Sequence, residues 1–424
     1  MRKSLLLLVA CCAAIFAACG SQRNSLTFAV GGAPNELEYW ETVAKNFKAE
    51  TGIEVKLLHQ PTDTDQRRQG LVLSLRSGRQ APDIFLMDVG WINQFANSGW
   101  LEPLDTQPAQ KAFSVAENFF PSIVHSVDIY RDRLIALPVY VDGGMLYYRR
   151  DLLAKYGANV PPETWDDLVR LSKRARKDQK TGFYGFVWQG AQYEGLVCNF
   201  LEFAGSAGGG VGIRDGHFYA NTPQNLKALE FMHALIESEV SPPNTFTEMR
   251  EEEVRNFFQR GNVLFERNWP YAWALHNEAT SPVRGKTAIA PLPHFPGGRS
   301  VATLGGWHVA VAAASKRKAE ALKFVEYILS YEVQKALALR LGWNPGRMDV
   351  YGDPEIRAKL PHFAKLRDIF ENAIARPNLP YYTLISEVMQ RHINAALSGR
   401  ENPELALRRI EEEADKVVRQ YETP

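Results

Sequence analysis

Hydrophobic and polar positions along the chain follow two alternating periods. Short apolar runs typical of strands occupy residues 26–30, 53–58, 83–87, 134–140, 145–148 and 263–266. Other stretches carry the helical pattern, with apolar residues on one face, over 36–51, 66–76, 164–177, 222–237, 318–329, 331–341 and 405–421. Gly52 ends the first of these helices, and Thr164 with Asp167 forms a capping-box variant at another. The alternation predicts an α/β protein with crossover helices.

The length of the chain indicates two lobes. About 405 of the 424 residues remain once a leader is set aside, more than one hydrophobic core usually holds. We expect the chain to cross between lobes at 139–142 and near 291–293, and a cleft between crossing segments is where ligands bind. The expected divisions are a leader (1–18), a tether (19–25), a first lobe (26–138 and 285–337) and a second lobe (139–284 and 338–424).

The first nineteen residues have the features of a bacterial lipoprotein leader. Arg2 and Lys3 form a positive head, and the apolar run 5–16 is too short to span a bilayer. The sequence Phe-Ala-Ala-Cys that ends at Cys19 is a lipobox pattern, in which the Cys19 thiol is acylated and the chain is cut before it. The alternative is a plain secretory signal with a chance cysteine. Either reading places the mature protein outside the cytoplasm, and a lipid would tether it to a membrane.

Charge and cysteine content narrow the possible functions. Losing Arg2 and Lys3 from 49 basic residues, against 48 acidic ones, leaves a mature charge of about −1, which argues against nucleic acid as a partner. Only Cys198 remains outside the leader and the lipidation site, so no intramolecular disulfide is expected. Its apolar neighbours favour a buried thiol over a nucleophile. No metal-binding spacing is present, and we expect neither a metal nor a cofactor.

Aromatic residues beside turns are the first candidates for ligand binding. Trp269 and Tyr271 follow a predicted strand on either side of Pro270, and Trp307 follows two glycines that let a ligand approach the backbone. Exposed aromatic faces of this kind stack on the apolar face of a sugar ring. The structural alternative is that these rings belong to the core, which is what we expect of three further residues: Trp40, Trp165 and Trp273.

Carboxylates at strand ends are the second set of candidates. Asp88 and Asp142 directly follow apolar runs, and ligands of open α/β sheets lie beyond the carboxyl ends of the strands. A carboxylate accepts hydrogen bonds from sugar hydroxyls, although a solvated turn aspartate explains the pattern equally well. The acidic runs 251–253 and 411–413 are interpreted as solvated helix faces, and His294 and His308 as surface or wall residues.

These segments together resemble a known family. The chain resembles the family 1 extracytoplasmic solute-binding proteins of ABC sugar importers, and within it the trehalose/maltose-binding proteins. The similarity covers essentially the whole mature chain and is carried, in order, by residues 31–36, 64–68, 85–88, 137–142, 186–190, 265–273, 304–308, 341–347, 376–377 and 380–382. It implies a two-lobed, type II-like periplasmic-binding-protein fold of two α/β lobes joined by a multi-strand hinge.

The resemblance also implies roles for individual residues. From the first lobe Glu36, Arg68 and Asp88 would hold hydroxyls, with Arg67 as the alternative to Arg68. The remaining residues would complete the site, from the hinge (Tyr140, Asp142), the second lobe (Trp269, Tyr271), the wall (Gly306, Trp307) and the far side (Arg376). Without the resemblance, Glu36 is explained as a first-turn helix acid and Arg68 as a solvated helix residue.

The function expected from these observations is disaccharide capture. A monomeric, lipid-anchored binding protein would close on trehalose or maltose and deliver it to the permease subunits of an ABC importer. Two binding alternatives are another neutral sugar, such as sucrose or a maltodextrin, and a polyol phosphate; the acidic residues disfavour an anion. A secreted glycosidase is a third alternative, since carboxylates near aromatic rings imitate an acid/base pair, but hydrolysis would defeat import.

Overall fold

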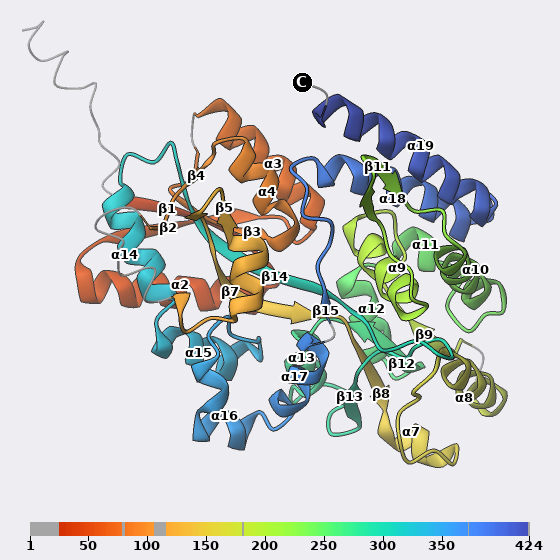
Figure 1. The fold of residues 1–424 in the computed structure, drawn as a ribbon. Coiled ribbons are helices and arrows are strands. Elements are labelled where there is room, and N and C mark those ends of the chain that lie inside the picture. The colour runs from red at the N-terminus through yellow and green to blue at the C-terminus, as the bar shows by residue number, and fades with distance from the viewer. Residues whose placement is uncertain (1–24, 79–80, 106–115, 180–181, 372, 423–424) are drawn as a thin grey trace, which may run out of the picture.

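The computed structural model describes residues 25–78, 81–105, 116–179, 182–371 and 373–422. Two α/β lobes lie side by side, as Figure 1 shows, and the two views agree that strands pass between them. The expected leader and the lipidation site at Cys19 lie outside the described residues. Within those residues, every helix falls short of the combined length and apolar character that crossing a membrane requires.

The first lobe is built on a mixed sheet in the order β15-β14-β3-β1-β2, with β4 and β7 also paired to β14. β1 is parallel to β2 and β3, and all seven of its residues are buried, as expected of a parallel strand covered on both faces. The elements of this lobe are β1 (Ser25–Gly31), α2 (Pro34–Thr51), β2 (Glu54–Gln60), α3 (Thr64–Ser77), β3 (Ile84–Asp88), η1 (Val89–Trp91), α4 (Ile92–Asn97), β4 (Leu101–Glu102), α6 (Pro121–Ile123), η2 (Val124–Asp128), β5 (Ile129–Tyr130), β6 (Arg133–Leu134), α14 (Lys318–Ile328) and α15 (Tyr331–Leu341).

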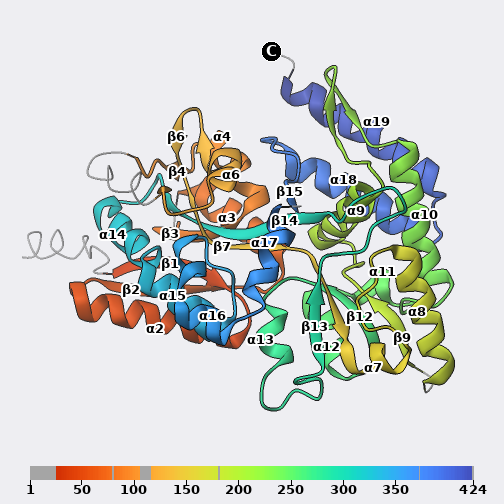
Figure 2. The same ribbon diagram turned by 60° about the horizontal axis from the view of Figure 1, so that its bottom comes forward.

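The second lobe surrounds a four-stranded sheet in the order β13-β8-β12-β9. Helices α8, α9, α10, α18 and α19 share one large apolar core with this sheet, in which Trp165 and Trp188 are fully buried. The elements are β8 (Met145–Arg149), α7 (Arg150–Lys155), α8 (Trp165–Asp178), β9 (Tyr184–Val187), α9 (Glu194–Ser206), β10 (Gly212–Arg214), β11 (His217–Tyr219), α10 (Pro223–Glu237), α11 (Thr245–Glu248), α12 (Glu251–Gln259), β12 (Val263–Asn268), α13 (Ala272–His276), β13 (Thr287–Ala290), α18 (Tyr382–Leu397) and α19 (Pro403–Glu422). Two short helices, η3 (Asp349–Gly352) and α16 (Pro354–Lys359), pack on α15 of the first lobe, and α17 (Phe363–Glu371) lies against the strands that join the lobes (Figures 1 and 2).

Three adjacent strands form the connection between the lobes. β14 (Ala302–Ala312) is antiparallel to β7 (Leu137–Gly143), and its first two residues pair in parallel with β15 (Ala373–Ile374). The other end of β14 pairs with β3 in the first-lobe sheet. The views in Figures 1 and 2 show β14 running from the first lobe into the space between the lobes. This multi-strand hinge confirms the predicted two-lobed architecture.

The positions of the crossings differ from the expected divisions. Strand β13, residues 287–290, pairs with β8 in the second lobe, and His294 bridges to Thr164 there, so the return crossing follows along β14 rather than near 291–293. The expected boundary at 337/338 falls inside α15, whose Leu337 and Leu341 both pack in a first-lobe core. The expected divisions at 285 and 338 therefore differ from the lobes as their sheets and cores define them: β13 belongs to the second-lobe sheet, and the end of α15 belongs to a first-lobe core.

A buried ion pair attaches β14 to the second lobe. Glu202 of α9 accepts a hydrogen bond from Arg267 Nε at 2.8 Å, also pairs with Arg267 Nη2, and accepts the Thr303 backbone N–H at 3.1 Å. Both charged side chains are almost fully buried, at 1% and 2% exposed. Removing one charge would leave the other unpaired in a low-dielectric interior.

Glu202→Gln is therefore expected to lower the free energy of unfolding by about 3 kcal/mol, because it leaves the buried Arg267 guanidinium without a counter-charge. Urea unfolding measures this change. The control is Glu239→Gln, which removes the partner of Arg176 at an exposed pair and should cost no more than about 1 kcal/mol. Equal losses in the two variants would contradict the structural role of the buried pair.

Candidate functional site

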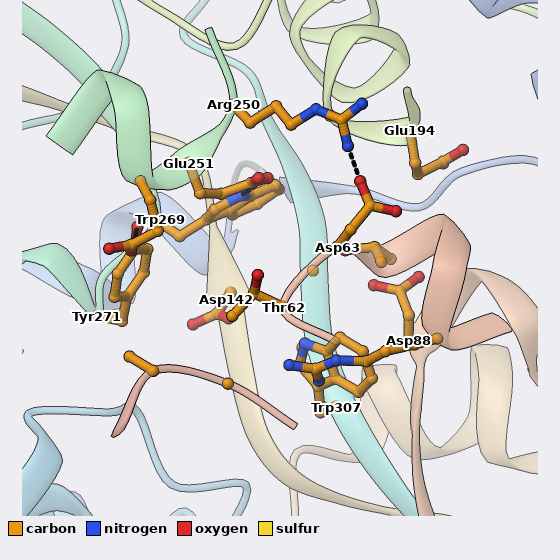
Figure 3. A pocket seen from close by; sticks show the side chains of 18 of the residues that line it. Thr62, Asp63, Asp88, Asp142, Glu194, Arg250, Glu251, Trp269, Tyr271 and Trp307 are labelled. Atoms are coloured by element: carbon orange, nitrogen blue, oxygen red, sulfur yellow. Dashed lines mark hydrogen bonds and ion pairs between the residues drawn. The ribbon is translucent and has the colours of Figure 1, made fainter. Parts of the chain in front are cut away.

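A cavity of about 320 Å³ lies between the lobes, and both lobes contribute to its wall. Its volume is at the lower end of the range of about 300–1,000 Å³ that is typical of small-molecule sites. In Figure 3, Asp63, Asp88 and Trp307 lie on one side of the space, and Trp269 and Tyr271 approach from the other. The cavity therefore sits at the hinge, where closure of the lobes changes its shape.

The structure brings most of the sequence-predicted residues together here. Nine of the ten line the cavity: Glu36, Asp88, Tyr140, Asp142, Trp269, Tyr271, Gly306, Trp307 and Arg376. Arg68 is not in the wall. Its guanidinium lies 2.7 Å from the Glu387 carboxylate of α18, in the other lobe.

Arg67 takes the position that the resemblance assigned to its neighbour. The Arg67 guanidinium carbon lies 4.3 Å from the Trp307 ring centroid, a cation–π contact, and its Nε donates to the Pro61 carbonyl at 2.6 Å. Arg67 lines the cavity, whereas Arg68 points to the second lobe. Consecutive helical residues are separated by about 100° around the axis, so the two arginines leave α3 in different directions, and Arg67 is the one that reaches the cavity.

Gly306 gives Trp307 its position. The Gly306 φ of +126° is unfavourable for other residues, and a Cβ there would lie 2.5 Å from the Tyr140 carbonyl oxygen of β7. The pairing of β14 with β7 shifts register between Trp307 and His308, which is the signature of a β-bulge. Bulges redirect side chains beside binding sites, and this one places Trp307 in the cavity wall.

Trp269 is supported from beneath by the buried ion pair. The Arg267 guanidinium carbon lies 3.9 Å from the Trp269 ring centroid, and Trp269 Nε1 donates to Glu251 at 3.3 Å. A Cβ on Gly305 would come within 3.0 Å of the same ring, so the indole packs closely on the backbone of β14. These contacts hold the ring in one orientation, and a stacking surface fixed in this way would lose little entropy on binding a ligand.

Arg376 connects carboxylates of the two lobes. Its Nη2 lies 2.7 Å from Asp88 at the end of β3, and its Nη1 lies 3.0 Å from Glu194 at the start of α9. Glu194 also accepts hydrogen bonds from Tyr382 and Ser386 of α18. Arg376 is thus both part of the cavity wall and a link across the hinge.

Two other carboxyl groups in the wall have no cation within ion-pair distance among the described residues. Burial, opposed by Arg67 and reinforced by Glu252, raises the pKa of Glu36 to about 8. Burial and the nearby Asp88 charge raise the pKa of Asp142 to about 7. Carboxyl groups of this kind have free oxygen atoms with which to accept hydrogen bonds from a ligand.

The comparisons with known proteins agree with this geometry. Residues 33–335 match the model of the bacterial extracellular solute-binding protein family. This chain belongs to that family. A probable ABC transporter-binding protein of Deinococcus radiodurans is 35% identical over 405 residues, which cover 94% of each chain. The family is extracellular, which places this solute-binding protein outside the cytoplasm.

Solved structures of solute-binding proteins are also similar. The structure of maltose-bound MalE3 of T. maritima has 39% sequence identity and a TM-score of 0.87, and the alignment covers 93% of this chain and 99% of that one. A solute-binding protein of an ABC transporter from Thermotoga lettingae TMO, bound with α-D-tagatose, has 30% identity and a TM-score of 0.83, over 93% and 100% of the two chains.

One aromatic residue of the wall was missed in the sequence. Trp343 lines the cavity, and its ring centroid lies 4.1 Å from that of Tyr140. It follows Gly342, which ends α15 with a φ of +68°. The same signal, a tryptophan directly after a glycine, identified Trp307 and would have identified Trp343.

Other interpretations from the sequence need correction. Glu251, Glu252 and Glu253 form the first turn of α12 and line the cavity, rather than a solvated helix face, and Tyr271 donates a hydrogen bond to Glu252 at 2.8 Å. His308 is fully buried beside Asp128, 2.6 Å away, and is not a surface or wall residue. Acidic residues in the first turn stabilise a helix wherever it lies, so their pattern does not distinguish solvent from a cavity.

The raised pKa of Asp142 makes the stability of the ligand-free protein depend on pH. Between the ordinary pKa of 3.8 and the folded-state value of about 7, the folded protein holds a proton that the unfolded chain has released. The stability that the Asp142 proton contributes is therefore complete below pH 3.8, and it is lost as the pH rises through about 7. Asp142→Asn imitates the protonated group. Its advantage over wild type in the free energy of unfolding should therefore increase by about 1–3 kcal/mol from pH 5 to pH 8, measured by urea unfolding.

Asp178→Asn provides the control for that measurement. Its hydrogen bond from Lys155 lowers the pKa of the exposed Asp178, so this residue stays ionised in both states across the same range. Its stability difference from wild type should not change between pH 5 and pH 8. If Asp142→Asn behaved in the same way, Asp142 would not carry a proton in the folded protein at pH 5.

Proposed function

We propose that this protein is the ligand-binding component of an ABC importer for a neutral disaccharide, trehalose or maltose. The observation that carries the proposal is the composition of the interlobe cavity, in which aromatic rings from both lobes face hydrogen-bonding carboxyl groups. Tyr140, Trp307 and Trp343 come from the first lobe and the hinge, and Trp269 and Tyr271 from the second. Sugar rings offer apolar faces to such aromatics, and their hydroxyls donate to carboxylates.

The arginines of the wall support a neutral ligand over a phosphorylated one. Arg250 pairs with Asp63, and Arg376 pairs with Asp88 and Glu194. Arg67 is bonded to a backbone carbonyl and stacks on Trp307. An anion would have to displace these partners and leave Asp63, Asp88 or Glu194 unpaired beside it, at a high electrostatic cost. We therefore disfavour a polyol phosphate.

The relatives support a sugar as the ligand class. One similar solved structure, at 39% identity, is described as maltose-bound and another, at 30%, as bound with α-D-tagatose. The relatives found are binding proteins, which supports capture and release of the ligand rather than hydrolysis. In this mechanism the sugar favours the closed arrangement because only there do both lobes contact it, and the permease then receives it from the closed protein.

Titration calorimetry of the chain from residue 20 onward, against trehalose, maltose, sucrose, maltotriose and glucose, tests the proposal. We expect one-to-one binding of trehalose or maltose, and a loss of about 30- to 1,000-fold in affinity in Trp269→Ala, because the variant removes a preorganised stacking surface. Trp273→Ala is the matched control, since Trp273 is also half-buried but stacks on His362, outside the cavity wall. Failure to bind any of these sugars would contradict the disaccharide assignment.

We also propose that a lipid on Cys19 anchors the mature protein to the membrane, as its lipobox pattern indicates. Cys19→Ala should abolish incorporation of radiolabelled palmitate in cells and release the protein into the soluble extracytoplasmic fraction. Cys198→Ala, which alters the buried thiol in α9, should leave labelling unchanged. Labelling that persists in Cys19→Ala would refute the anchor.

A further inference from the structure

The first two turns of α3 touch the second lobe at three places. Asp63, at the N-cap of α3, forms an ion pair with Arg250 at the start of α12, which Figure 3 shows across the cavity. Asp65 lies beside Glu194, the first residue of α9, and burial together with the Glu194 charge raises the pKa of Asp65 to about 6. Arg68 pairs with Glu387 of α18 at 2.7 Å. One helix of the first lobe therefore contacts three helices of the second.

We infer that Arg68 and Glu387 form a closing latch, a pair of positioning residues that sets the affinity of the site without touching the ligand. Neither residue lines the cavity. They belong to opposite lobes, so their 2.7 Å contact exists only while the lobes are close together. The pair therefore stabilises the closed arrangement relative to the open one, whichever sugar is bound.

The surroundings of the pair suit a reversible contact. The Arg68 side chain is 11% exposed, so it is held in one place, whereas the Glu387 side chain is 53% exposed and can return to water when the lobes separate. Breaking the contact thus leaves the carboxylate solvated rather than buried, which keeps the cost of opening small. Arg67, beside Arg68 on the same helix, lies on Trp307 in the cavity wall, so α3 carries both ligand recognition and closure.

The latch makes a quantitative prediction about affinity. The apparent dissociation constant equals the intrinsic constant divided by the fraction of protein in the closed arrangement. Loss of the latch lowers the closed fraction of the protein by a factor that does not depend on which ligand binds. Every sugar should therefore lose affinity by the same factor, whereas loss of a wall residue changes each sugar differently.

The test is Glu387→Gln, with calorimetry on the same sugars at about 20 mM and about 500 mM salt. At low salt we expect every sugar that binds to lose about 1.5- to 5-fold in affinity, by one common factor, since partly exposed ion pairs contribute at this level. At high salt the difference should shrink, because screening weakens the pair in the wild type. The charge swap Arg68→Glu with Glu387→Arg should restore the affinity. Glu54→Gln removes an exposed pair with Lys48 inside the first lobe and should change nothing.

A second measurement needs no ligand and separates this inference from the proposed function, on which the sugar panel rests. Spin labels on Glu38→Cys of α2 and Glu230→Cys of α10, both exposed, report the distance between lobes. Adding Glu387→Gln should shift the population towards longer distances. Unchanged affinities together with unchanged distances would overturn the latch, as would losses that differ from sugar to sugar. If no sugar binds the wild type, the distance measurement alone decides.

Discussion

The pairing of β14 with strands on both of its sides is the constraint on which the site depends. One end of the strand is fixed in the first-lobe sheet by β3, and the other lies against β7 and β15 and is bonded to the second lobe through Glu202. The two glycines of the strand pair with β7, and Trp307 pairs with both β7 and β3. The strand thus supplies the hinge, the floor against which Trp269 packs and one aromatic face of the wall. A site built in this way changes shape whenever the lobes move.

Several charged residues of the cavity wall pair across the two lobes. Arg250 pairs with Asp63 of the opposite lobe, and Arg376 pairs with one carboxylate from each lobe, so the positive charges of the wall are part of the contacts between the lobes. In the part of the chain that the structure describes, Glu36 and Asp142 have no such partner within ion-pair distance, and their burial raises their pKa values. Desolvated acceptors of this kind gain most from hydrogen bonds that a ligand donates, because unpaired buried polar groups are costly.

The sequence predicted the lobes better than the path between them. Periodic segments such as α2, α8 and α15 were found almost to the residue, because their apolar positions face a core at regular spacing. β14 was not recognised as a strand, since Gly305 and Gly306 weaken the strand pattern and their role is visible only where β7 approaches. The expected boundary near residue 285 differs from the strand pairing for a related reason: β13 pairs with β8 of the second-lobe sheet, and local composition does not encode such pairing. Long-range pairing was the missing information.

The two neighbouring arginines of α3 show the same limit at the scale of a single side chain. The family resemblance locates a basic pair at 67–68, but which guanidinium faces the ligand depends on the rotation of the helix about its own axis. That rotation is set here by Leu71 and Leu75, which are buried against the first lobe and turn Arg67 towards Trp307. Arg68, about 100° further round, is then directed at the opposite lobe. If Arg67 recognises the ligand and Arg68 forms the latch, as we propose, the packing of one helix connects ligand binding with lobe movement.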